Sequence, residues 1–353
     1  MKFIIRNIKR ILRLCFALQL SGIVKLIKQY NRKSSNVILV PTYIKGYFLN
    51  SLEHDFVLAS VLVNAGKDYR FVHLNNYRKI RNSFVIYNPH EVFGAGYVNY
   101  SLRLTQIVKE LEANNNSVFY PSADIEWWEN KTFMHNKFES LGVRCPETYV
   151  IPLEEISSYR ELPLSFPFLI KEEHSCAAQG VHKVNSRSEF DKIINSDAFK
   201  LRNENVIIQK LIKMHRDLRV ILIRSEIVLH YWRVNPSEEW KPTSTSHGSN
   251  VDFVSFPEQW RDYIINAFEK LNITTGAFDI TWDDDDLSTE PYFLEISPSY
   301  QPNPPMDLKG RRFTYGQWKK KLLLKDSWDE HYIRIIYSIK SKLLSPIINN
   351  LSK

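Results

Sequence analysis

The sequence has few cysteines, no long apolar run and no acidic residue near its start. Three cysteines in 353 residues are too few and too scattered for a disulfide framework or a zinc site, which fits a reducing cytoplasm. No run of about 18 apolar residues occurs, so we expect no transmembrane helix. No segment is of low complexity, and the chain is long enough for two or three packed subdomains.

Basic charge is confined to the two ends of the chain. Residues 1–52 hold ten Lys or Arg and no Asp or Glu, and residues 307–353 hold eleven against four. Since the whole chain carries +8, the part between these ends carries −9. Aromatic residues are not interleaved with the basic ones and the body is acidic, so we expect no nucleic-acid partner.

Both basic ends have apolar residues at helical spacing. Residues 4–18 and 332–351 each predict a helix with an apolar face between Lys and Arg side chains, which is typical of helices lying in a membrane interface. The alternative for each is a helix docked on the protein body. No small-residue cleavage site follows the apolar stretch 14–20, so we interpret the N-terminus as retained. We predict a cytoplasmic protein and hypothesise peripheral attachment to an anionic inner membrane face.

The pattern changes to short strands after residue 35. Strands at 36–40, 69–74, 84–87 and 117–120 and helices at 53–65 and 101–113 predict a small α/β domain with a mostly parallel sheet. The stretch Gly94–Val98 lacks the third glycine of a dinucleotide-binding loop, so we do not predict such a site.

A polar loop between two strands follows a helix that should end at Gly142. The first strand ends in Lys171, and the second begins after Gly180. Small residues between them allow the loop to close over a ligand with its backbone N–H groups exposed, as in phosphate-binding loops. The alternative is a plain hairpin loop.

Two predicted hairpins between residues 217 and 299 bring charged residues together. The first, 217–236, places Arg219 and Arg233 on neighbouring strands, which implies an anion between them. In the second, Gly276–Ser299, a turn near Leu287 places Asp279 opposite Glu295, about 5 Å away at the backbone. Two such carboxylates repel unless a divalent cation such as Mg²⁺ lies between them. The alternative is a solvated hairpin whose charges never meet.

Taken in order, these motifs resemble the ATP-grasp superfamily, and among its members the carboxylate-amine ligases that add amino acids, such as the ribosomal-protein glutamate ligases. The matching pieces are Asn136-Lys137 before a Gly-Val-x-x-Pro-x-Thr segment, FPFLIK, the loop to Gly180-Val181, VIIQKLI, DLRV, Arg233, GAFDI and FLEIS. The resemblance implies a mixed α/β and α+β fold, namely an ATP-grasp fold with an N-terminal α/β pre-ATP-grasp domain and basic helical termini. The expected parts are a basic helix 1–35, an α/β domain 36–125, a linking helix 126–149, a lid 150–210, a C-terminal subdomain 211–310 and a basic tail 311–353.

The resemblance also implies roles for individual residues. ATP would contact Lys137, Lys171, Gln179, Gly180, Gln209, Lys210, Leu211 and Asp217. Arg219 and Arg233 would be catalytic, and Asp279, Glu295 and Ser297 would hold Mg²⁺. The family usually has Asn where Ser297 stands, so Asn303 is an alternative ligand. The lid loop also has fewer glycines than usual, and a catalytically degenerate ATP-binding or scaffold protein at the membrane remains the alternative function.

The resemblance implies a carboxylate substrate and an amine substrate, joined as an amide through an acyl phosphate. Together with the basic ends, it leads to the hypothesis that an amino acid is attached to a uronic-acid-type sugar in envelope polysaccharide biosynthesis. Candidate sugar-stacking faces are Trp127, Trp128, Trp232 and Trp240. Packing roles are the alternative for each of them.

Overall fold

The chain folds into two units that alternate along the sequence. Unit 1 contains residues 1–95, 103–122 and 301–353, and unit 2 contains residues 96–102 and 123–300. The computed structural model describes residues 2–41, 48–90, 93, 99–156, 158–175, 180–236, 240–245, 248–253, 255–308, 310–321, 323 and 325–351. Each unit is described separately below.

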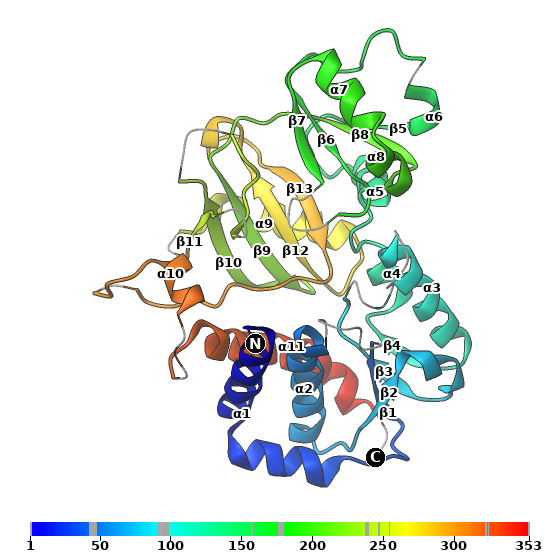
Figure 1. The fold of residues 1–353 in the computed structure, drawn as a ribbon, viewed down its shortest axis with the longest axis vertical. Coiled ribbons are helices and arrows are strands. Elements are labelled where there is room, and N and C mark those ends of the chain that lie inside the picture. Colours follow the sequence, from blue (N-terminus) through cyan, green and yellow to red (C-terminus); the bar gives the residue numbers. More distant parts are fainter. Residues whose placement is uncertain are drawn as a thin grey trace. The chain divides into compact units, whose positions relative to one another are not determined.

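A parallel four-stranded sheet is the centre of unit 1 (Figure 1). Its order is β2-β1-β3-β4, with β1 Asn36–Val40, β2 Arg70–His73, β3 Phe84–Ile86 and β4 Ser117–Phe119. All five residues of β1 are buried, as the apolar run predicts. Helix α2 (Phe48–Asn64) connects β1 to β2, and helix α3 (Tyr100–Ala113) lies between β3 and β4 in the sequence. The predicted α/β arrangement with a parallel sheet is therefore confirmed.

The two basic ends form helices that pack with α2 in unit 1. These are α1 (Lys2–Gln29), interrupted at Gln19 with φ 59°, and α11 (Trp328–Asn349). The apolar face of α11 is buried, including Ile333, Ile336, Ile339, Leu343 and Leu344. A short helix, α10 (Tyr315–Lys320), begins with a capping box at Thr314 and Gln317. Within the described residues, no helix has the length and apolar character needed to span a bilayer.

Unit 2 contains two antiparallel sheets, and the first belongs to the region expected to form a lid. Its order is β5-β8-β6-β7, with β5 Thr148–Pro152, β6 Phe168–Lys171, β7 Val181–Val184 and β8 Asn205–Lys210. Three helices accompany it: α6 Leu153–Ile156, α7 Arg187–Ile194 and α8 Asp197–Arg202. Phe168, Ile170, Phe190 and Ile208 share its core. Serine side chains cap α7 and α8, which fixes where these helices start.

The second sheet of unit 2 carries most of the predicted site residues. Its order is β11-β10-β9-β12-β13, with β9 Arg216–Ile223, β10 Glu226–Val234, β11 Asn250–Asp252, β12 Thr275–Thr281 and β13 Tyr292–Ser297. Helices α5 (Lys131–Leu141) and α9 (Arg261–Lys270) pack on it through a core that includes Phe138, Phe268 and Phe278. Helix α5 ends at Gly142, whose φ of 62° lies in the left-handed region that favours glycine. Among the described residues, unit 1 also contains the short helix η1 Leu74–Lys79. Further short helices are α4 Ser122–Ile125, η4 Glu258–Trp260 and η5 Asp283–Asp285.

Candidate functional site

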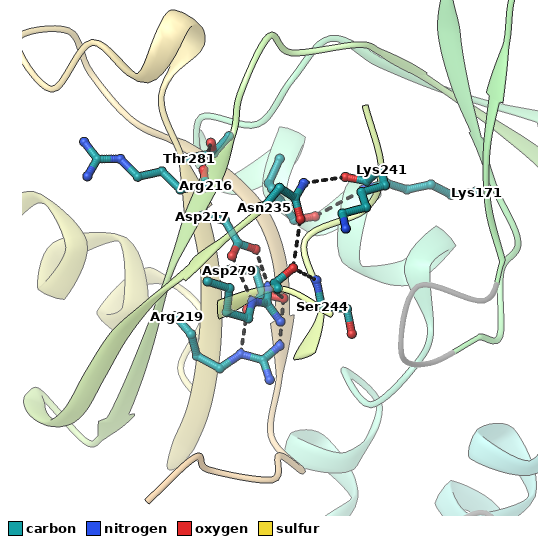
Figure 2. Close-up of polar contacts among 12 residues, drawn as sticks. Lys171, Arg216, Asp217, Arg219, Asn235, Lys241, Ser244, Asp279 and Thr281 are labelled. Atoms are coloured by element: carbon teal, nitrogen blue, oxygen red, sulfur yellow. Dashed lines mark hydrogen bonds and ion pairs between the residues drawn. The ribbon is translucent and has the colours of Figure 1, made fainter. Parts of the chain in front are cut away.

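Four charged side chains from three adjacent strands of unit 2 form one ionic cluster. Strand β9 contributes Asp217 and Arg219, β10 contributes Arg233 and β12 contributes Asp279. Arg219 is directly opposite Asp279 in the pairing of β9 with β12, and Asp217 is opposite Arg233 in the pairing of β9 with β10. Figure 2 shows the side chains of Asp217, Arg219 and Asp279 close together on the sheet. The short turn between β9 and β10 is what brings the two arginines into the same cluster, as the sequence predicts.

Arg219 binds Asp279 through two parallel hydrogen bonds. Its Nε donates to Oδ1 at 2.7 Å and its Nη2 donates to Oδ2 at 2.8 Å. Arg233 donates from Nε to Asp217 Oδ1 at 2.8 Å, and its Nη2 lies 2.8 Å from Asp279 Oδ2. Burial alone would raise the pKa of Asp279, but the two guanidinium groups lower it to about 2. The anion that the arginine pair was expected to share is therefore, in this structure, the chain's own Asp279.

The predicted pairing of Asp279 with Glu295 is confirmed. The two residues are register partners on β12 and β13, next to a β-bulge at Asp279/Ile280. Asp279 is 7 % exposed, and Glu295 is half-buried. Ser297 is two residues further along β13 and therefore on the same face as Glu295, with its hydroxyl donating to Ser299 O at 2.5 Å. Asn303 lies in unit 1 and is buried there.

The carboxylate oxygen atoms of Asp279 and Glu295 suit Mg²⁺ better than a transition metal. Within the described residues, no group of three or more His, Cys, Asp or Glu side chains is arranged to hold a metal ion. Mg²⁺ is commonly held by one or two carboxylates together with substrate phosphates, so Asp279 and Glu295 are a sufficient protein contribution. Asp279 Oδ2 contacts both arginines, whereas Oδ1 accepts from Arg219 alone and keeps a second lone pair for a cation. The donor set therefore fits the predicted ion.

Two buried lysines, Lys131 and Lys171, lie near the ionic cluster. Of the two, only Lys171 was expected from the sequence to contact ATP. Lys171 ends β6, and its Nζ donates to Leu294 O on β13 at 3.4 Å. Burial, together with the charge of Lys131, lowers the pKa of Lys171 to about 8 against the opposing effect of the Glu295 carboxylate. Lys131, the first residue of α5, is 4 % exposed and donates from Nζ to Ser175 O at 2.5 Å and to Ser175 Oγ at 3.1 Å.

Lys137, which was expected from the sequence to contact ATP, is exposed on the same helix. Its Nζ lies 5.6 Å from the centre of the Phe133 ring. The structure therefore places Lys131 rather than Lys137 beside Lys171. The sequence feature that could have pointed to Lys131 is Asn130, a residue type that favours helix starts. Its side chain accepts a hydrogen bond from Phe133 N, so α5 begins directly after it, at Lys131.

The loop after Lys171 is anchored at its base by buried acidic residues. Glu173 accepts from Thr132 Oγ1 at 2.6 Å and from Asn205 N at 2.8 Å, and Glu172 N donates to Gly180 O at 2.8 Å. A Cβ at Gly180 would lie only 2.7 Å from Glu172 Cβ, so only glycine fits there without a shift of the loop. Gln179 falls outside the described residues.

The segment predicted to contact the adenine follows β8. Gln209 is 1 % exposed, and its Nε2 donates to Thr148 Oγ1 at 2.8 Å. Lys210 N donates to Glu147 O at 2.8 Å, and Leu211 is half-buried in the connection to β9. The predicted adenine contacts of these residues stay predictions.

Most of the expected sugar-stacking tryptophans are core residues. Trp127, Trp128 and Trp232 are each at most 4 % exposed, so these three have the packing role that was the alternative to a stacking face. Trp232 packs against Trp282 and donates to Ser255 O at 2.6 Å. Trp240 alone of the four is half-buried, and Lys183 Nζ lies 5.8 Å from the centre of its ring.

No sequence-family profile and no curated protein matches this chain. Solved structures do match it over most of its length. The D-alanine–D-alanine ligase from Bacillus anthracis complexed with ATP aligns with a TM-score of 0.56 and 11 % identity, covering 87 % of this chain and 99 % of that one. The D-cycloserine synthetase DcsG gives a TM-score of 0.53 and 12 % identity over 86 % and 99 % of the two chains. A RimK domain protein from Sphaerobacter thermophilus gives 0.52 and 11 % over 86 % and 98 %.

Proposed function

We propose that this chain, which has the ATP-grasp fold, is an ATP-dependent carboxylate-amine ligase. The observation that carries the proposal is the Asp279–Glu295 pair with Arg219 and Arg233 bonded to it. Solved structures with the same fold include ligases that join two amino acids, which supports the reaction class. The buried Lys131 and Lys171 supply positive charge for a nucleotide polyphosphate near the same carboxylates.

The proposed reaction has two steps. A substrate carboxylate oxygen attacks the γ-phosphorus of ATP, the bond to the bridging oxygen breaks, and ADP and an acyl phosphate result. The amine then attacks the acyl carbon, the bond from that carbon to the phosphate oxygen breaks, and phosphate leaves with the proton lost by the amine. Mg²⁺ held by Asp279 and Glu295, with Ser297 beside them, would neutralise charge on the β- and γ-phosphates.

The chain's arginines have the charge that this chemistry requires. Arg219 is about one-fifth exposed at its side chain, whereas Arg233 is held between Asp217 and Asp279. Arg219 is therefore the more accessible group for the transferring phosphoryl oxygens, and Arg233 the one that keeps Asp217 and Asp279 together. Both guanidinium groups would stabilise the negative charge of the transition state and of the acyl phosphate.

A lysine pair on one helix provides a matched test of nucleotide binding. We expect Lys131→Ala to weaken ATP binding by about tenfold or more, since a hydrogen bond to a charged group contributes about 1.5–3 kcal/mol. Lys137→Ala should change the affinity by less than about twofold, because its ammonium group is exposed. Isothermal titration calorimetry measures both, and a larger effect for Lys137→Ala would contradict this assignment of the phosphate site.

Turnover separates the ligase from a degenerate ATP-binding protein. Release of ADP and phosphate should require Mg²⁺, a carboxylate and an amine together. Tight ATP binding without turnover for any pair of substrates would instead favour the binding or scaffold function.

We propose a uronic-acid-type sugar as the carboxylate and an amino acid as the amine, in an envelope polysaccharide precursor. Trp240 is the remaining candidate for a sugar-stacking face. Mass spectrometry of polysaccharide from cells with wild-type protein or Glu295→Ala tests this, because a lost amide mass names both reactants. Identical masses would refute the proposed substrate.

We also propose that unit 1 attaches the protein to an anionic membrane surface. Helix α1 keeps Leu12, Val24 and Ile27 exposed although it packs with α2, and Lys25 and Lys28 flank the last two. Ile27→Asn combined with Lys28→Glu should reduce sedimentation with phosphatidylserine liposomes. Unchanged sedimentation of this double variant would refute attachment through α1.

A further inference from the structure

His135 is a buried histidine of α5 whose hydrogen-bonding capacity is unused. It is 3 % exposed, and neither ring nitrogen has a hydrogen-bond partner among the described residues. Buried polar atoms are nearly always paired in proteins, and leaving one unpaired costs about 1–3 kcal/mol. A ring with two such atoms therefore indicates a partner outside the described residues.

The surroundings of His135 point to an anion as that partner. Lys131 lies one helical turn before it, on the same face of α5, and its Nζ contacts Ser175 at the base of the lid loop. Helix α5 also contacts β13, where Ile296 N donates to Met134 Sδ at 3.4 Å. Lys171 Nζ reaches the same strand at Leu294 O.

His135 is a neutral imidazole in this environment. Burial, followed by the charges of Lys171 and Lys131, holds the pKa of His135 well below its usual value. A neutral imidazole has one N–H donor and one acceptor nitrogen. A water molecule could bond to both nitrogens, but it would add no negative charge beside Lys131 and Lys171, of which Lys171 has the carboxylates of Glu295 and Asp279 nearby. A phosphate group would accept the N–H and neutralise both lysines.

We propose that His135 donates a hydrogen bond to the nucleotide phosphate group that Lys131 and Lys171 bind. The proposal rests on the proposed function, because it names a residue of the same ATP site. Phe138, whose ring centre lies 6.3 Å from the imidazole centre, packs edge-on against His135 and limits its rotation. The histidine then adds a directed donor to two lysines that act mainly through charge.

The experiment compares ATP with adenosine, which lacks the phosphates. We expect His135→Phe to weaken ATP binding by about tenfold while leaving adenosine binding unchanged. His135→Gln keeps an N–H donor and should recover part of the loss. His230→Gln is the matched control. His230 lies on β10 and packs against the Phe256 ring, with ring centres 4.9 Å apart, so the change should leave both affinities unchanged.

Histidine ring ¹⁵N signals of the wild-type protein give a readout that does not depend on the variants folding. The His135 signals should shift on addition of ATP and stay in place with adenosine. If wild type binds ATP but these signals do not move, or if His135→Phe binds ATP as wild type does, the inference is overturned and the proposed function stands. If wild type does not bind ATP, both are refuted.

Discussion

Replacing Asp279 by Asn should destabilise the protein as well as weaken its metal site. The two guanidinium groups lower the pKa of Asp279 from 3.8 to about 2, which corresponds to a preference of ~2.4 kcal/mol for the ionised form. The amide introduced by Asp279→Asn would offer Arg219 one acceptor and one donor, so one of the two parallel hydrogen bonds is lost. Breaking a buried ion pair typically costs about 3–5 kcal/mol. We therefore expect a loss of about 2–5 kcal/mol in the free energy of unfolding at pH 7.

Glu295→Gln is the matched control for this prediction. Glu295 is half-buried and accepts no hydrogen bond from the described residues, so its loss should change stability by less than about 1 kcal/mol. Both variants should lower Mg²⁺-dependent ADP release by at least about tenfold, because each removes a carboxylate ligand. Urea denaturation of the two proteins, with an ADP-release assay, measures both effects. Equal stability of the two variants would refute the reasoning that Asp279 holds the arginines together.

Two further predictions concern one residue of each unit. Lys340 is buried, and its Nζ donates to Tyr120 Oη at 2.6 Å. Burial lowers the pKa of Lys340 from 10.5 to about 7. Between these two pH values the folded state binds the proton less well than the unfolded state, so the free energy of unfolding rises with pH. Lys340→Met should therefore stabilise the protein, by ~3 kcal/mol more at pH 7 than at pH 9.5 in urea denaturation, and a gain that does not depend on pH would contradict the prediction. Gly180→Ala should lower stability by about 1–3 kcal/mol and weaken ATP binding, because its Cβ would lie 2.7 Å from Glu172 Cβ and Ser175 Cβ. Calorimetric scans and ATP titration measure both effects, and a fully active, equally stable variant would show that the loop base is not tightly packed.

The parts of the fold that follow from local periodicity were predictable from the sequence. Alternation along 217–234 predicts β9 and β10, and their short turn brings Arg219 and Arg233 into one cluster. Counting back from the acidic turn correctly predicts that Asp279 lies opposite Glu295. The first inference succeeds because a short turn limits the possible register of the two strands. The second holds for Asp279 and Glu295 although a bulge at Asp279/Ile280 shifts the register of the residues nearer the turn by one.

The partners of charged groups, in contrast, depend on which strands and helices meet, and periodicity carries no such information. The arginine pair correctly indicated an anion, but only the pairing of β12 with β9 identifies Asp279 as the anion that is already present. Lys131 and Lys137 lie on one helix, and a sequence pattern cannot tell which of them faces Lys171. Residues 131 and 137 are separated by six positions, or about 240° around a helix, so they cannot both face the same partner. Only the docking of α5 against β13 shows that the buried face begins at Lys131 and continues through His135, whereas Lys137 faces outward.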